Sequence, residues 1–279
     1  MCLTCGCGGD EDPSSHGSHE REGGGTQVIR AHTHEHHEHG EVGASLHGDG
    51  ENGRRIRLEQ DLLEKNDRLA RQNRERFRRE GMLVLNLVSG PGSGKTTLLE
   101  RILRELSGEM PLGVIEGDQT TTLDADRISA TGTPAVQINT GRVCHLDAHM
   151  VAHAADSLPS LAGGVLFIEN VGNLVCPSAF DLGETLRVVL LSVTEGEDKP
   201  LKYPYLFEGA PVALLTKTDL SPHTGFDTAL CASNLRRVRP DVRLFELSSR
   251  TGEGFPAWID WIRQEARSVR DRIPDAVSS

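Results

Sequence analysis

Residues 89 to 97 have the types and spacing of a phosphate-binding loop, Ser-Gly-Pro-Gly-Ser-Gly-Lys-Thr-Thr. Glycines let backbone N–H groups turn toward a phosphate, and the start of a helix favours its negative charge. Lys95 can bridge the β- and γ-phosphates, and the Thr96 hydroxyl can ligate Mg²⁺. Ser89 replaces the first glycine of the motif, a mild departure because three glycines remain. The residues predicted to hold the phosphates are Gly90, Gly92, Ser93, Gly94, Lys95, Thr96 and Thr97.

A second motif indicates which base is bound. Thr216, Lys217 and Asp219 follow an apolar run in the [NT]-K-x-D pattern of guanine readers. The Asp219 carboxylate can accept hydrogen bonds from guanine N1–H and the 2-amino group, a donor pair that adenine lacks. Ser248 and Ser249 follow the last apolar run, where guanine readers place a second loop whose backbone contacts O6. The sequence therefore predicts GTP and GDP as the nucleotides.

Two further apolar runs end in carboxylates. Asp118 follows one of them, and Glu169 follows another and is itself followed by Gly172, in the manner of a γ-phosphate-sensing switch. In parallel sheets, ligand-binding groups gather at the carboxyl ends of strands. We therefore take Lys95, Thr96, Asp118 and Glu169 as the candidate catalytic residues, with Asp118 positioning the attacking water.

Metal-ligating residues are concentrated at the N-terminus. Cys2, Cys5 and Cys7 place three thiols within reach of one ion, and thiolates and imidazoles suit borderline metals such as zinc, nickel and Cu(I). Eight of the twelve histidines also lie in the first 53 residues, on a glycine-punctuated backbone that suits several exchangeable ions. This segment has no apolar face to bury, so we expect it to be disordered without a ligand. The alternative is a low-complexity tail without function.

The elements that must position these residues are seven apolar runs of strand length. They are spaced widely enough for crossover helices, so an α/β fold is expected, a P-loop NTPase with a mostly parallel sheet and helices on both faces. The runs cover residues 82–88, 112–115, 135–138, 165–168, 188–193, 212–215 and 242–245.

The domain organisation follows from the changes in composition. We expect a disordered Cys/His-rich metal-binding tail over residues 1–53, a charged helical segment over 54–80 and a GTPase domain over 81–279. Asn66, Asp67 and Asn73 weaken the helical pattern, and a break is possible near residues 65–67. This helix is expected to pack on the domain and lead the tail away, with docking to a partner as the alternative.

The charge distribution excludes several kinds of partner. Ten acidic residues and two arginines give the first 53 residues a net charge of −8, out of −11 for the whole chain. A general electrostatic attraction to nucleic acid or an anionic membrane is therefore disfavoured. The sequence has no apolar run long enough to span a membrane and no signal-peptide pattern at its start. We therefore expect a cytoplasmic protein.

Taken together, these motifs resemble one family, the hydrogenase nickel-incorporation GTPases called HypB. The resemblance runs from about residue 54 to residue 270 and includes Glu-Gly-Asp-Gln at 116–119, Gly-Arg-Val-Cys-His-Leu-Asp-Ala at 141–148 and Glu-Asn-Val-Gly-Asn-Leu-Val-Cys-Pro at 169–177. The opening Cys-Leu-Thr-Cys-Gly-Cys resembles the family's high-affinity nickel motif. Ser89, Thr216 and the Ser-Ser-Arg at 248–250 depart from the family pattern.

The resemblance implies a metallochaperone that binds nickel and delivers it during nickel-iron hydrogenase maturation. It implies that Cys144, His145 and Cys176 are the metal ligands of the GTPase domain, for Ni²⁺ with Zn²⁺ possible, at a homodimer interface formed with GTP and metal bound. Implied partners are a HypA-type zinc/nickel accessory protein and the hydrogenase large-subunit precursor. Slow hydrolysis is also implied, and it agrees with the lack of an obvious arginine finger in the sequence, although Arg127 is available.

Cys231 has no neighbouring ligand in the sequence, and we expect it to be a buried core residue. Two other functions remain open. One is a nickel or zinc storage protein with a regulatory or vestigial nucleotide site, which an intact Lys95, Thr96 and Asp219 weigh against. The other is a urease-type nickel-insertion GTPase, which the double-cysteine tail and the separated Cys176 weigh against.

Overall fold

The computed structural model describes residues 27–30, 51–118, 123–141 and 143–272. Cys2, Cys5, Cys7 and the histidine-rich run lie outside these residues. The described strands form one sheet in which every pairing is parallel, in the order β1-β4-β3-β5-β2-β6-β7-β8. Their bounds are β1 Gln27–Arg30, β2 Leu83–Ser89, β3 Leu112–Asp118, β4 Ala135–Asn139, β5 Val165–Glu169, β6 Leu186–Ser192, β7 Val212–Thr216 and β8 Arg243–Glu246.

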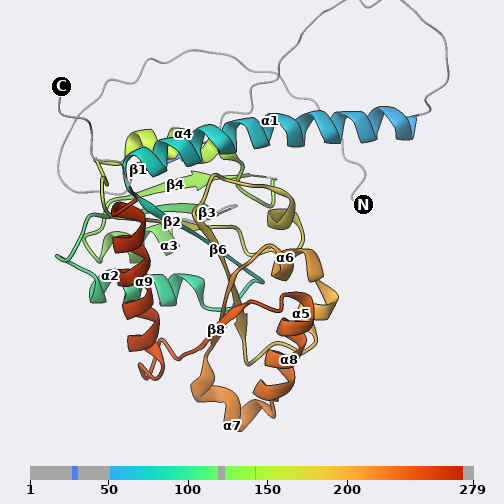
Figure 1. Ribbon diagram of the computed structural model, residues 1–279, viewed down its shortest axis with the longest axis vertical. Coiled ribbons are helices and arrows are strands. Elements are labelled where there is room, and N and C mark those ends of the chain that lie inside the picture. The colour runs from blue at the N-terminus through green and yellow to red at the C-terminus, as the bar shows by residue number, and fades with distance from the viewer. Residues whose placement is uncertain (1–26, 31–50, 119–122, 142, 273–279) are drawn as a thin grey trace, which may run out of the picture.

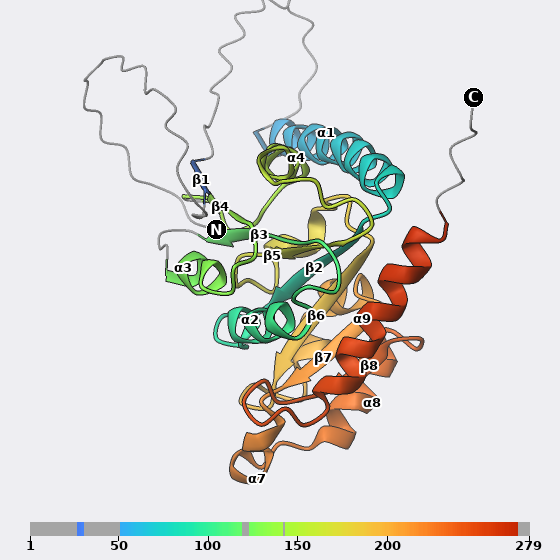
Figure 2. The same ribbon diagram turned by 90° about the vertical axis from the view of Figure 1, so that its left-hand side faces the viewer.

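Helices cover both faces of the sheet, as the sequence predicted (Figures 1 and 2). The side chains of β2 alternate: Leu83, Leu85 and Leu87 pack with α2, α3 and α9, whereas Val84 faces α1 and α4 and Val88 faces α6 and α8. The helices are α1 Glu51–Arg79, α2 Lys95–Glu105, α3 Leu123–Ser129, α4 Ala148–Ser157, α5 Lys199–Lys202, α6 Pro204–Glu208, α7 Ser221–Thr224, α8 Thr228–Val238 and α9 Phe255–Arg270, with 3₁₀ turns at Cys176–Ala179 and Thr218–Leu220.

The N-terminal segment contains one ordered element that the sequence analysis did not expect. Residues 27–30, Gln-Val-Ile-Arg, form β1 and pair in parallel with β4, from Gln27 opposite Val136 to Arg30 opposite Asn139. The prediction of disorder is wrong for these four residues, because two β-branched residues complete the open edge of β4. Because the pairing is parallel, Arg30 lies at the carboxyl end of β4, opposite Asn139.

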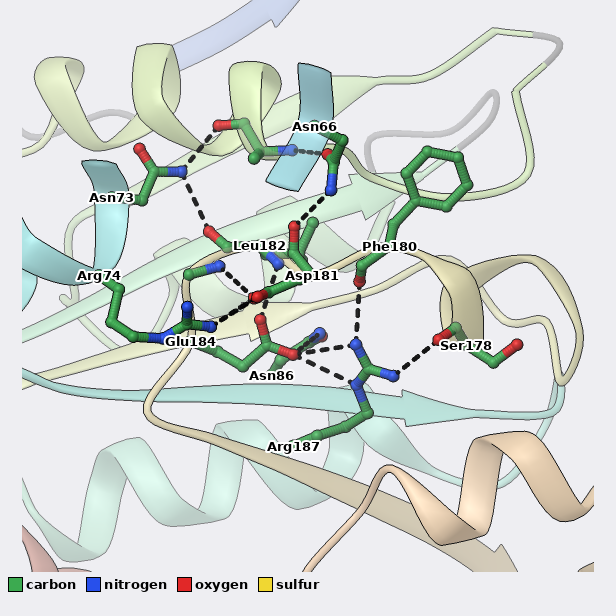
Figure 3. A network of polar contacts seen from close by, with 12 residues as sticks. Asn66, Asn73, Arg74, Asn86, Ser178, Phe180, Asp181, Leu182, Glu184 and Arg187 are labelled. Carbon is green, nitrogen blue, oxygen red and sulfur yellow. Dashed lines mark hydrogen bonds and ion pairs between the residues drawn. The ribbon is translucent and has the colours of Figure 1, made fainter. Parts of the chain in front are cut away.

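The helix α1 is continuous and begins at Glu51, three residues before the predicted boundary. The helix has no break near residues 65–67, where the sequence left one open. Asn66 and Asn73 weaken the helical pattern because their side chains serve tertiary contacts. The Asn66 amide donates to the carbonyl of Asp181 at 2.8 Å and accepts from the N–H of Ala148 at 2.9 Å. The Asn73 amide donates to the carbonyls of Ala148 and Leu182 (Figure 3).

Replacing Asn73 by leucine is expected to lower the free energy of unfolding by about 1–3 kcal/mol, because two buried carbonyls lose their donor. Gln72→Leu is the matched control, since Gln72 is exposed on the same helix and its replacement is expected to change stability by less than about 0.5 kcal/mol. Urea unfolding of both variants measures the difference. If the Asn73→Leu and Gln72→Leu variants were equally stable, α1 would be held by apolar packing alone.

Among the helices that the structure describes, none is both long enough and apolar enough to cross a membrane.

Candidate nucleotide and metal site

The phosphate-binding loop joins β2 to α2, as the sequence predicted. Gly94 has a φ of 93°, a left-handed conformation that favours glycine, and immediately precedes the first helical residue, Lys95. The Lys95 ammonium is buried and donates to the Ser89 hydroxyl at 2.9 Å, and Ser93 also donates to that hydroxyl. Burial lowers the pKa of Lys95. Ser89, the departure from the glycine motif, therefore holds the lysine that a phosphate would engage.

Thr96 and Glu169 fit a divalent cation. The Thr96 hydroxyl donates to Glu169 Oε1 at 2.8 Å, whereas Glu169 Oε2 is buried and has no hydrogen-bond partner among the described residues. Burial raises the pKa of Glu169 to about 7, opposed by the charge of Lys95 and the hydrogen bond from Thr96. A buried, partnerless carboxylate oxygen beside a hydroxyl is a donor set that suits Mg²⁺.

These residues line a cleft of about 440 Å³ at the carboxyl end of the sheet. Among the described residues, its lining includes Pro91, Gly92, Ser93, Gly94, Lys95, Thr96, Thr97, Glu116, Gly117, Asp118, Asp124, Arg127, Glu169, Asn170, Gly172 and Lys217. The sequence analysis selected Asp118, at the end of β3, as a residue of this cleft. β3 also carries Glu116 into the cleft, and the sequence analysis missed that residue.

Glu116 could have been found from the two-residue period of a strand, which puts residues 116 and 118 on the same face. Its side chain is 2% exposed, and Oε2 has no hydrogen-bond partner among the described residues. Burial, followed by the charges of Glu169, Asp124 and Asp118, raises the pKa of Glu116 to about 9. Burial in the cleft thus favours the protonated form of the Glu116 carboxyl group.

Glu116→Gln is expected to stabilise the nucleotide-free protein. A folded-state pKa near 9, against an ordinary 4.5, means that the folded protein binds the extra proton and loses stability as the pH rises between those values. The glutamine variant should lack this part of the loss and should be more stable by at least about 1 kcal/mol at pH 8. Glu75→Gln, on the exposed face of α1, is the control. Parallel stability profiles from pH 5 to pH 9 would contradict the prediction.

Arg127, noted in the sequence as an available arginine, also lies in the cleft. Its guanidinium donates to Glu100 at 2.6 Å, to Thr97 at 3.0 Å and to Asp124 at 3.2 Å. The group is therefore anchored to the start of α2 and to α3 at the edge of the cleft. In this arrangement it can reach a phosphate only by exchanging partners.

Two of the predicted base-binding residues contact the phosphate-binding loop. Thr216 donates its hydroxyl to the Ser93 carbonyl at 2.8 Å, and the Lys217 ammonium donates to the Gly92 carbonyl at 2.6 Å. Lys217 has a φ of 59°, the one positive φ among the described residues other than glycine. Of the predicted base residues, Lys217 alone lines the described cleft. The Lys217 side chain thus lines the cleft and contacts the phosphate-binding loop.

Asp219 lies beside the second predicted loop. The Ser248 hydroxyl donates to Asp219 Oδ1 at 2.6 Å, and Arg250 lies 3.9 Å from the other carboxylate oxygen. The Ser249 carbonyl accepts from Arg101 at 2.7 Å. The sequence analysis expected the backbone of this loop to contact O6. The Ser248 hydroxyl has a different role in the structure, since it orients the carboxylate of Asp219.

The structure brings together Cys144, His145 and Cys176, whose candidate ligand atoms all lie within 4.8 Å of one another. The three side chains are partly exposed, and the His145 ring stacks on Phe180 with centroids 3.8 Å apart. Burial, followed by contact with Cys176, raises the pKa of the Cys144 thiol, and burial lowers the pKa of His145. Two thiols and an imidazole suit Zn²⁺ or Ni²⁺ and leave a coordination position open.

Two asparagine side chains hold the two segments that carry these ligands. The Asn173 side chain accepts from the N–H of Cys176 at 3.2 Å, and the Asn170 side chain accepts from the N–H of Leu146 at 3.3 Å. A Cβ at Gly117 would lie 2.7 Å from the Leu146 side chain, so only glycine lets β3 approach this segment. Asn170 also lines the nucleotide cleft, and the sequence analysis did not identify it. In the sequence, nothing distinguishes Asn170 from an ordinary loop residue.

Cys231 lies in the core and is fully buried, which confirms the sequence prediction. Burial raises the pKa of its thiol to about 12. The described cysteines therefore divide into a close, accessible pair and one inert core residue.

Comparisons with known proteins agree with this geometry. A family model described as CobW/HypB/UreG, nucleotide-binding domain, matches residues 83–246. Hydrogenase maturation factor HypB of Azotobacter vinelandii is 58% identical over 84% of this chain and 78% of its own length. The same factor of Escherichia coli K12 is 48% identical over 95% of this chain and 99% of its own length.

Two solved structures have the same fold. HypB from Helicobacter pylori in complex with nickel has a TM-score of 0.70 and 39% identity, over 73% of this chain and 96% of that one. HypB from Archaeoglobus fulgidus has a TM-score of 0.68 and 40% identity, over 72% and 98% of the two chains. The cleft, the cysteine–histidine cluster and these relatives lead to one conclusion: the chain belongs to the HypB family of hydrogenase maturation factors, with the nucleotide-binding domain shared by CobW, HypB and UreG.

Proposed function

We propose that this chain is a GTP-hydrolysing nickel metallochaperone that delivers nickel during nickel-iron hydrogenase maturation. The observation that carries the proposal is the short segment from Glu169 to Cys176. Its first residue contacts Thr96 in the cleft, and its last lies beside Cys144 and His145. A change at the phosphates therefore has only the six residues between Glu169 and Cys176 to cross to reach the metal ligands.

In this proposal Lys95 neutralises the β- and γ-phosphates, and the N–H groups of the loop from Gly90 to Thr97 cradle them. Thr96 and Glu169 hold Mg²⁺, which supplies charge neutralisation on the triphosphate when bound. Asp118 orients the attacking water, and Gly172 senses the γ-phosphate.

Base recognition is assigned to the residues around β7. Asp219 receives the two donors of guanine, with Ser248 orienting the carboxylate, while Thr216 and Lys217 tie this loop to the phosphates. Ser249 completes the second loop. These contacts predict preference for GTP over ATP.

Cys144, His145 and Cys176 hold Ni²⁺, with Zn²⁺ accepted by the same ligands. The nickel in the H. pylori HypB structure supports this assignment. Cys2, Cys5 and Cys7 form a second store in a metal-binding tail over residues 1–53, joined by the helical segment 54–80 to the GTPase domain over 81–279.

The partly exposed cluster also suits an interface. We propose a homodimer with GTP and metal bound, with a HypA-type accessory protein and the hydrogenase large-subunit precursor as partners in nickel transfer. The hydrogenase maturation role of the relatives supports this set of partners.

The decisive experiment is anaerobic nickel titration of the full chain and of a variant with Cys2, Cys5 and Cys7 replaced by serine, each with GDP and with a non-hydrolysable GTP analogue. Nucleotide is expected to change the nickel affinity that survives in the serine variant, and nickel must then change nucleotide affinity by the same factor. Nickel binding without nucleotide dependence or GTP hydrolysis would favour the storage function.

Asp219→Asn is expected to shift preference from GTP toward xanthosine triphosphate. The amide can donate to the 2-oxo group of xanthine, where the carboxylate could only accept. Asp241→Asn is the control, because Asp241 is exposed after α8. The ratio of the two dissociation constants is the measurement, and an unchanged ratio would remove Asp219 from the base site.

A further inference from the structure

A buried polar network lies where β6 begins, beside the cluster of metal ligands but not part of it (Figure 3). Glu184 and Arg187 form its centre, with side chains that are 7% and 10% exposed and a nitrogen–oxygen distance of 3.2 Å. Glu184 Oε1 also accepts from the Asn86 side chain on β2 at 3.1 Å, and Oε2 accepts from the N–H of Leu182 at 2.8 Å. Both carboxylate oxygens therefore have partners, and the ion pair is fixed to two strands of the sheet.

Arg187 uses the rest of its guanidinium to hold the turn that carries Cys176. Its Nη1 donates to the carbonyl of Ser178 at 3.1 Å, and its Nη2 donates to the carbonyl of Phe180 at 2.9 Å. Ser178 belongs to the 3₁₀ turn that begins at Cys176, and the Phe180 ring stacks on the ring of His145. One side chain of β6 therefore fixes the backbone beside two of the three metal ligands.

These contacts need the shape of a guanidinium. Arginine presents five N–H donors in a rigid planar fork, so Arg187 can pair with Glu184 and donate to two carbonyls at once. The group is also enclosed, since a Cβ at Gly209 would lie 3.2 Å from its Nη1. A lysine at this position would keep the charge but carries its donors on a single nitrogen. It could pair with Glu184 or bind the carbonyls, but not both.

We infer that Arg187 is a positioning residue for the nickel site, which holds Cys176 and His145 in place for the ion through two backbone carbonyls of the turn. The inference rests on the proposed function, in which these two residues and Cys144 bind nickel. Ligands that are held before the ion arrives lose less conformational entropy on binding. Groups that orient metal ligands contribute about 10- to 100-fold to affinity. The alternative is an ion pair that serves only the fold.

The test is anaerobic nickel titration of Arg187→Lys, in the full chain with serine in place of the three tail cysteines. In this parent protein, thiolate-to-nickel charge-transfer absorption reports Cys144 and Cys176, because Cys231 is fully buried. Arg187→Lys is expected to weaken nickel binding by at least about tenfold and to change the position or intensity of that absorption. Circular dichroism and urea unfolding without metal measure the fold separately.

A second variant guards against loss of the fold. Glu184→Gln combined with Arg187→Met leaves no unpaired charge in the buried site, and replacing both members of a buried ion pair is often neutral for stability. It removes both donors to the turn, so nickel binding should weaken at least as much as in Arg187→Lys. Its absorption should change as well.

Arg74→Lys is the matched control from the same network. Among the described residues, Arg74 pairs with the carboxylate of Asp181 at 2.6 Å rather than with a carbonyl of the turn, and its side chain is 45% exposed. A lysine can keep this exposed pair, so nickel affinity and absorption should be unchanged.

The outcomes separate this inference from the proposed function. A parent protein without thiolate-to-nickel absorption would contradict the nickel site itself. If the parent shows the absorption, a folded Arg187 variant with the parent's affinity and spectrum would overturn the inference. If neither Arg187 variant folds, the residue serves the fold, and the inference is overturned in that case too.

Discussion

Lys95→Ala is expected to reduce GTP hydrolysis to background, by a factor on the order of 10² to 10³ or more, and to weaken triphosphate binding. Lys95 is 8% exposed and held at the start of α2 by Ser89, where the loop would place a phosphate. Alanine removes the positive charge from a buried position in which water cannot replace it. The protein should remain folded, since burial of the ammonium disfavours its charged form.

Phosphate release under saturating GTP is the measurement, and Lys202→Ala is the matched control because Lys202 is exposed on α5 and pairs only with nearby Asp198 among the described residues. Metal binding by the tail should be unchanged in the Lys95 variant. Normal GTP turnover would show that the buried lysine serves the fold and not the phosphates.

The second large effect is expected from the double variant Cys144→Ala, Cys176→Ala. Removing two of three ligands should weaken nickel binding at the GTPase domain by at least about 100-fold and abolish metal-enhanced dimerisation with a GTP analogue. Total nickel capacity of the full chain should fall only slightly, because the tail keeps its own ligands. Metal binding should also weaken as the pH falls, since Cys144 must lose its proton and its pKa is raised.

Light scattering measures dimerisation, and equilibrium dialysis measures nickel binding. Cys231→Ala is the control for loss of a thiol: it should lower stability, because that side chain is fully buried, and leave nickel binding intact. If the double variant still dimerises more strongly with metal, the two cysteines are structural and the proposed interface site is wrong.

Strand-length apolar runs and the glycine-rich loop were sufficient to predict the parallel sheet and its carboxyl edge. These features are local: a strand of Leu and Val, followed by glycines and a helix with apolar residues at helical spacing, has few alternative folds. The identity of the phosphate-binding residues, the carboxylates 118 and 169, and the burial of Cys231 follow from that pattern together with the rules of parallel sheets.

Sequence reasoning was weakest for polar residues whose partners are distant. In the sequence, Asn66 and Asn73 weaken the helical pattern. In the structure, each is buried and contacts residues more than 70 positions away. β1 was missed because four residues have too little hydrophobic pattern to signal a strand until the edge of β4 is present. Glu116 was not selected because the apolar run ends at residue 115, whereas β3 continues to Asp118 and buries the Glu116 side chain.

The sequence by itself determined the chemistry that is available: a phosphate loop, a guanine motif and two sets of soft metal ligands. Tertiary structure decided how the groups of each site are brought together. Cys144 and Cys176 are separated by 31 intervening residues, and they approach because Asn170 and Asn66 hold their segments at the same edge of the sheet. Long-range hydrogen bonds of this kind leave no periodic signal, since each depends on a single polar side chain meeting one backbone group in the folded chain.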